Sequence, residues 1–149
     1  MVDTLSLIFS IVAICVSVFV AYKEYQRDLK INETNLEATY FDEIYKQHLI
    51  YKIPKARRYL RIASNNQIAD DQPLIDELNA IRKESLYFLY TNKPFYDSLI
   101  SKLQQLEDFL VSSEAKQLVG EEQTEFFSQV QNYMNEIYTH ITSAYKGKS

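Results

Sequence analysis

The stretch FYDSLISKLQQLEDFL, residues Phe95–Leu110, decides the class of fold. Its large apolar residues recur at spacings of 4, 4, 3 and 4, the period of an amphipathic α-helix. They are Phe95, Leu99, Leu103, Leu106 and Leu110. A helix with one apolar stripe needs other helices to cover that stripe. The stretch therefore predicts one member of a helical bundle.

The segments on either side carry the same kind of pattern. Upstream, Pro73 suits the first turn of a helix that reaches about Tyr90. Its apolar side is formed by Leu74, Leu78, Ile81, Ser85 and Phe88. Downstream, a last helix that ends before Gly147 carries Phe126 or Phe127, Val130, Met134, Ile137 and Ile141. With only two glycines and three prolines in 149 residues, the chain favours long helices over sheet, and an all-α fold is expected.

The connections between these helices are predicted from local signals. Thr34-x-x-Glu37 is a capping box and predicts a new helix near Asn35. One face of that helix holds Leu36, Tyr40, Ile44 and then His48 or Leu49. Pro54 should break or kink it before a short helix over Lys55–Ala63. Ser64–Gln72 reads as a loop, and Gly120 as the cap of the helix that contains Phe95–Leu110.

The N-terminal stretch TLSLIFSIVAICVSVFVAY, residues Thr4–Tyr22, has no charge over 19 residues. At 1.5 Å per residue it spans about 28 Å, close to the hydrocarbon thickness of a bilayer. It predicts a transmembrane anchor over residues 1–30, juxtamembrane extension included, ahead of a helical bundle over 31–149. No Lys or Arg precedes the span, whereas Lys23, Arg27 and Lys30 follow it. The expected topology is single-pass in the inner (plasma) membrane, with the N-terminus outside and the bundle cytoplasmic.

One face of this N-terminal helix differs from the rest. At 100° per residue, a sector of about 80° collects the small and polar residues of the segment. They are Asp3, Ser6, Ser10, Ala13, Ser17 and Glu24. Small residues let two helices pack closely, which is one interpretation. The other is a homo-oligomer whose polar stripe lines a pore, with acidic residues at both mouths to favour cations.

Positive charge is concentrated in one window of the chain. Ile44–Ala69 has six Lys and Arg and no acidic residue, which leaves −10 for the rest of a chain of net charge −4. The candidate ligand-binding residues are Lys52, Lys55, Arg57, Arg58 and Arg61, with Tyr51 and Tyr59 interleaved. Cations hold phosphate, and tyrosine offers a flat face to a base. Three interpretations stay open: a solvated helical face, anionic lipid headgroups, or a nucleotide signal or short single-stranded nucleic acid.

Signals of catalysis are missing from the sequence. It has no glycine-rich phosphate loop, no nucleophile elbow and no Cys or His cluster. Glu136 and His140 share a helix face, but no third ligand is near them in sequence. Cys15 lies in the apolar run and is expected to be a small packing residue. We therefore predict a protein that is not an enzyme and has no metal or cofactor.

This architecture, with the Ser6, Ser10, Ala13, Ser17 stripe and the Lys52–Arg61 patch, resembles the small membrane effectors of bacterial anti-phage defence. Within that group the chain is similar to the channel-forming subunits of Hailong-type systems. The resemblance implies a tetrameric channel with a soluble crown that binds a short DNA signal. Two classes of function follow: an oligomeric channel gated by an anionic signal, or a membrane-anchored adaptor whose bundle docks a protein partner.

Overall fold

The computed structural model describes residues 2–146. Within that range, the side chains at 2–8, 10–11, 30, 32–37, 43–44 and 146 lie outside the description. The chain divides into two units, residues 1–39 and residues 40–149.

Helices hold 84% of the residues, so the fold class is all-α. The elements in chain order are α1 (Val2–Gln47), the π-helical turn η1 (His48–Lys52), α2 (Ile53–Tyr59), β1 (Arg61–Ile62), β2 (Ile68–Ala69), α3 (Gln72–Glu84), α4 (Leu86–Thr91), α5 (Lys93–Glu114) and α6 (Glu121–Lys146).

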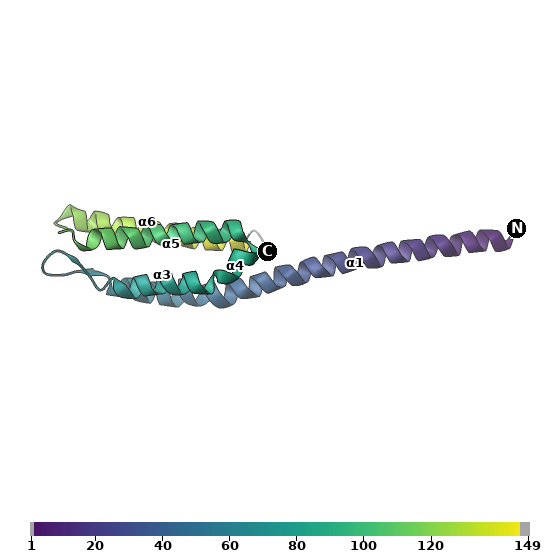
Figure 1. The fold of residues 1–149 in the computed structure, drawn as a ribbon, viewed down its shortest axis with the longest axis horizontal. Coiled ribbons are helices and arrows are strands. Elements are labelled where there is room, and N and C mark those ends of the chain that lie inside the picture. Colours follow the sequence, from purple (N-terminus) through teal and green to yellow (C-terminus); the bar gives the residue numbers. More distant parts are fainter. Residues whose placement is uncertain (1, 147–149) are drawn as a thin grey trace. The chain divides into compact units, whose positions relative to one another are not determined.

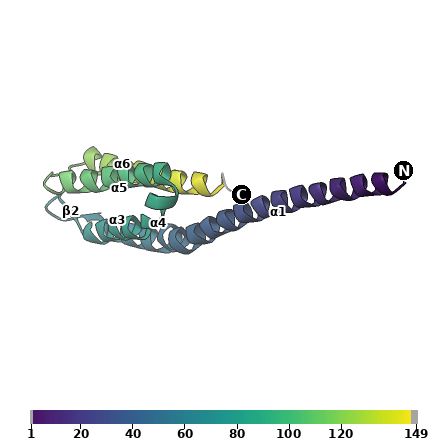
Figure 2. The ribbon, with the colours of Figure 1, turned by 45° about the vertical axis from the view of Figure 1, so that its right-hand side comes forward.

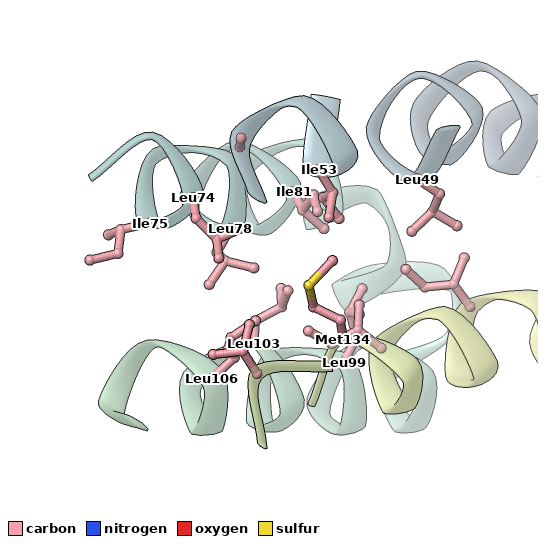
Figure 3. Close-up of a cluster of buried hydrophobic side chains, with 14 of the residues drawn as sticks. Leu49, Ile53, Leu74, Ile75, Leu78, Ile81, Leu99, Leu103, Leu106 and Met134 are labelled. Carbon is pink, nitrogen blue, oxygen red and sulfur yellow. The ribbon is translucent and has the colours of Figure 1, made fainter. Parts of the chain in front are cut away.

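The second unit is built as two layers (Figures 1 and 2). One layer holds the end of α1, η1, α2 and α3, while α5 and α6 lie side by side in the other, and the short helix α4 connects the two. Figure 3 shows Leu78 and Ile81 of α3 pointing toward Leu103 of α5 and Met134 of α6. The core therefore lies between the layers, and the predicted helical bundle is confirmed.

The apolar stripes predicted from the sequence form this core. All five stripe residues of α5 and all five of the Pro73–Tyr90 segment are buried. On α6, Phe126 is buried and Phe127 only partly so, and Val130, Met134, Ile137 and Ile141 complete the buried set. Spacing alone located these side chains because a stripe of that period can face only one side of a helix.

The helix boundaries predicted at Thr34–Glu37 and for the Pro73–Tyr90 segment are wrong. The capping box does not start a helix, since α1 runs without a break through Asn35 to Gln47; no glycine or proline interrupts it, and capping-box residues are also tolerated inside helices. The Pro73–Tyr90 segment is two helices, because it bends at Ser85, whose buried hydroxyl lies 2.8 Å from the hydroxyl of Tyr45.

A π-helical turn precedes Pro54. The chain passes through η1, in which the N–H of Ile53 bonds to the carbonyl of His48, five residues back. Pro54 then occupies the first turn of α2, where no N–H is required. The expected disturbance at Pro54 is present, and the helix that follows ends at Tyr59 instead of Ala63.

The predicted loop Ser64–Gln72 contains the second strand of a small hairpin, whose first strand lies just before it. β1 and β2 pair antiparallel, with Arg61 opposite Ala69 and Ile62 opposite Ile68. Asn66 in the turn and Asp70 directly after β2 adopt φ of 63° and 58°, a region that these residue types tolerate. The N–H of Leu118 bonds to the carbonyl of Asn66, which attaches the hairpin to the α5–α6 connection.

Gly120 does not cap α5, which ends at Glu114. With φ of 60°, it directly precedes α6.

The first unit is helical throughout its described part. Its described apolar side chains, which include Phe9, Ile14, Val18, Phe19 and Tyr22, are all largely exposed. Among the described residues, no helix has a stretch both long and apolar enough to span a bilayer.

Candidate anion-binding face

One side of η1 and α2 presents aromatic and cationic groups to solvent. Tyr51 is 66% exposed and Tyr59 is 51% exposed, and Lys55 and Arg58 are also exposed. They share this side because a helix returns to the same direction after three or four residues. Lys52, which is half-buried, lies beside Tyr51 in sequence. These five residues are called the anion face below.

Arg57 is turned away from the anion face. Its guanidinium carbon lies 4.8 Å from the centre of the Phe127 ring on α6, a cation–π contact between the two layers. Burial lowers the pKa of Arg57 from its ordinary value, and its Nε is buried without a hydrogen-bond partner among the described atoms. Arg57 therefore holds α2 against α6 and is a poor candidate for a ligand contact.

Arg61 is also engaged within the chain. Its Nε donates to Asp70 Oδ2 at 2.6 Å across the hairpin. Both side chains are largely exposed, so the pair is weak and open to competition from solvent. Of the five predicted cations, two therefore already have partners in the fold.

The remaining cations, Lys52, Lys55 and Arg58, have no acidic partner among the side chains that the structure describes. These cations lie between Tyr51 and Tyr59 in the chain, so they can hold phosphate oxygens while a tyrosine ring stacks on a planar base. Ligand binding by the seven predicted residues stays a prediction, and sequence spacing could not tell which arginines would have partners in the fold.

A buried histidine fixes η1 beneath this face. His48 has no exposed surface: its Nδ1 contacts Glu77 Oε1, and its Nε2 lies 2.9 Å from Glu84 Oε2. Ionised carboxylates only accept hydrogen bonds, so both contacts are satisfied together when both ring nitrogens carry protons. The sequence pattern placed His48 or Leu49 on the apolar face of a helix, but the partners of His48 are 29 and 36 residues away and gave no local signal.

The predicted pore stripe is described only in part. The side chains of Asp3, Ser6 and Ser10 lie outside the described residues, while Ala13, Ser17 and Glu24 are exposed. Ser17 Oγ donates to the carbonyl of Ala13 at 2.8 Å. Its hydroxyl is thereby satisfied within the helix, which suits either apolar surroundings or a neighbouring helix.

Glu136 and His140, which share a helix face, each contact a different residue of α5. His140 stacks on Phe95 and its Nε2 lies 3.2 Å from the Phe95 carbonyl, while Glu136 accepts from Lys102 Nζ at 3.0 Å. The described part of the chain holds no group of three or more residues fit to bind a metal ion. Both residues serve the packing of α6 against α5.

The chain matches no protein-family model, no curated protein and no solved structure.

Proposed function

We propose that this protein is a membrane-anchored effector whose helical bundle binds a phosphate-bearing ligand, a nucleotide signal or a short single-stranded nucleic acid, on the anion face. The observation that carries the proposal is the set of unpaired cations between two exposed tyrosines on one helical side. A merely solvated face would not need aromatic rings exposed to this degree. Stacking of one base on a tyrosine is worth about 1–3 kcal/mol.

The anchor is supported by the N-terminal helix. Thr4–Tyr22 has no charged residue, and the large apolar side chains described in it point to every side of the helix except the one that holds Ala13 and Ser17. A helix that is apolar over most of its circumference is stable when something else covers it, either protein or lipid. The excess of Lys and Arg after the span favours a cytoplasmic bundle.

The test is a titration of the purified full-length protein with short oligonucleotides and nucleotide second messengers at two salt concentrations. Three phosphate contacts should give affinity that falls with salt at a log–log slope of about −2. Reversing Lys55 and Arg58 to Glu should weaken binding roughly a hundredfold, since each charge-assisted bond contributes about 1.5 kcal/mol or more.

The matched control is Lys116→Glu, an exposed cation on the α5–α6 connection, which should leave binding unchanged. The Arg57→Lys variant should also bind these ligands normally. The Arg57 guanidinium is stacked on Phe127 and therefore does not belong to the anion face. If the parent binds none of these ligands at low salt, the proposal fails and the adaptor becomes the better explanation.

A second candidate, an ion channel like that of the Hailong-type subunits, is favoured by Glu24. This carboxylate is exposed, has no ionic partner among the described side chains, and falls on the same helical side as Ser17. An acidic ring at a pore mouth attracts cations. In planar bilayers, Ser17→Leu should reduce conductance and Glu24→Gln should reduce cation preference, while the protein in detergent should have the mass of an oligomer larger than a dimer. A monomeric mass would exclude the channel.

A further inference from the structure

A groove lies between the two layers of the bundle, where the end of α1 and η1 face α6. Its volume is about 360 Å³, and its walls are mainly apolar and aromatic. The principal wall residues are Phe41, Tyr45, Leu49, Tyr138, Ile141 and Tyr145. Tyr138 on α6 reaches across to η1, where its hydroxyl donates to the Leu49 carbonyl at 2.5 Å. The groove belongs wholly to the 40–149 unit and is separate from the anion face.

Three of the four hydroxyl groups in the wall are already bonded within the protein, and the fourth belongs to Tyr145, which is 45% exposed. Tyr45 is bonded to Ser85, Tyr138 to the Leu49 carbonyl, and Thr142 Oγ1 donates to the Tyr138 carbonyl at 2.7 Å. Burial raises the pKa of both tyrosines, so both stay protonated and uncharged. A polar ligand would find little to bond with inside the groove, whereas an apolar one loses nothing by entering it.

The size of the groove limits the ligand. An apolar cavity of about 150 Å³ binds benzene, so this groove suits a hydrocarbon body of roughly a dozen carbons. Its mouth carries one cation, Lys46, and one anion, Asp42, on adjacent turns of α1. Their nearest atoms are 3.8 Å apart and both side chains are about 60% exposed, so the pair is loose and Lys46 is free to turn to another partner.

We propose that this groove binds a single-chain amphiphile with an anionic head, such as an unesterified fatty acid. The tail lies along the aromatic wall, and the carboxylate lies beside Lys46. Leu49 and Ile50 of η1 line the groove, and the next two residues, Tyr51 and Lys52, belong to the anion face. Both sites therefore share one π-helical turn.

The experiment uses the full-length protein in phospholipid nanodiscs and dodecanoic acid with a diazirine at the end of its tail. After irradiation, mass spectrometry should find label on peptides that contain residues 41–50 and 138–145, and excess unlabelled dodecanoate should remove it. Thr142→Trp fills the groove from an exposed position and should reduce this labelling roughly tenfold or more, because excluding even two methylenes from burial has that effect.

Thr139→Trp is the matched control, since Thr139 is exposed on the same helix and does not line the groove. It should label like the parent. Lys46→Glu should shift the preference from the carboxylate probe to the corresponding amine. The proposal is overturned if the parent labels equally with acid and amine, or if Thr142→Trp labels as strongly as Thr139→Trp. It is also overturned if Thr142→Trp halves the mass of a dimer, because a second copy would then fill the groove.

Discussion

Phe88, in the 40–149 unit, has no exposed surface, whereas Phe19, in the first unit, exposes 59% of its surface. The two residues are chemically identical and both lie in helices. Phe88 packs edge-on against Phe95 and Tyr40, with ring centres 5.2 and 5.7 Å apart. The only ring contact described for Phe19 is with the ammonium of Lys23, which lies 5.6 Å from the ring centre.

The difference comes from how apolar residues are distributed around each helix. In α5 the buried apolar residues form one stripe, so the neighbouring helices cover that stripe from one side. In the N-terminal part of α1 the large apolar residues point to every side except the small and polar one, and one neighbour could cover only a fraction of them. The bundle buries its own apolar stripes, whereas the large apolar side chains described in the N-terminal helix are exposed.

The largest expected effect is on the bundle core. Phe88→Ala should lower the free energy of unfolding by about 3–5 kcal/mol, because it removes a fully buried ring from an aromatic cluster. Phe19→Ala makes the same chemical change at an exposed position and should alter that free energy by less than about 0.5 kcal/mol. Denaturant unfolding followed by circular dichroism measures both. Equal losses would remove the distinction between the units.

A charge placed in the N-terminal helix tests what covers the exposed apolar side chains of that helix. On the proposal that lipid covers this helix, Val16→Lys should reduce membrane retention by the equivalent of about 2.5–3.5 kcal/mol, the insertion cost of lysine at a helix centre. Leu29→Lys, beyond the uncharged run, should have little effect. Retention is measured by carbonate extraction of membranes. Full retention of the Val16→Lys protein would argue that another protein, and not lipid, covers this helix.

A smaller effect is expected at the His48 bridge. His48→Leu keeps most of the volume but leaves Glu77 and Glu84 without their partner. Loss of the bond to the largely buried Glu77 should cost about 1.5–3 kcal/mol, and loss of the bond to Glu84 adds little because that side chain is 46% exposed. His140→Leu is the control, because that half-buried ring stacks on Phe95 and its one described hydrogen bond is to a backbone carbonyl, so no carboxylate loses a partner. In thermal unfolding, the melting temperature of the His48→Leu variant should be well below that of the His140→Leu variant. The reverse order would show that the His48 bridge is not needed for stability.

The smallest effect concerns pH. The pKa of Glu114 is raised, first by its hydrogen bond to Asp71 and then by the Asp71 charge. A raised carboxyl pKa means that the folded state binds the proton more tightly, so this pair favours folding as pH falls through the raised pKa and opposes it at neutral pH. Glu114→Gln should therefore be slightly more stable than the parent at pH 7, and the difference should shrink toward pH 4.5. A difference that does not vary with pH would contradict this coupling.

Much of the fold could be predicted from the sequence, for reasons visible in particular residues. The stripes on α3, α5 and α6 predicted their buried side chains because a regular period leaves one possible face. The break at Ser85 could not be predicted, since it depends on Tyr45, forty residues earlier in the chain. The short hairpin was missed because strands of two residues leave no periodic pattern.

The candidate site also has features that the sequence predicts and features that only the tertiary structure decides. By itself the sequence determined the all-α fold class, the apolar stripes, the uncharged N-terminal run and the concentration of cations between Ile44 and Ala69, because each is a property of spacing along one helix or of local composition. Only the tertiary structure decided that Phe127 engages Arg57, that Asp70 engages Arg61, and that His48 is enclosed by Glu77 and Glu84. Those pairings depend on distances between layers, and a contact between helices is fixed by packing that no single stretch of sequence encodes.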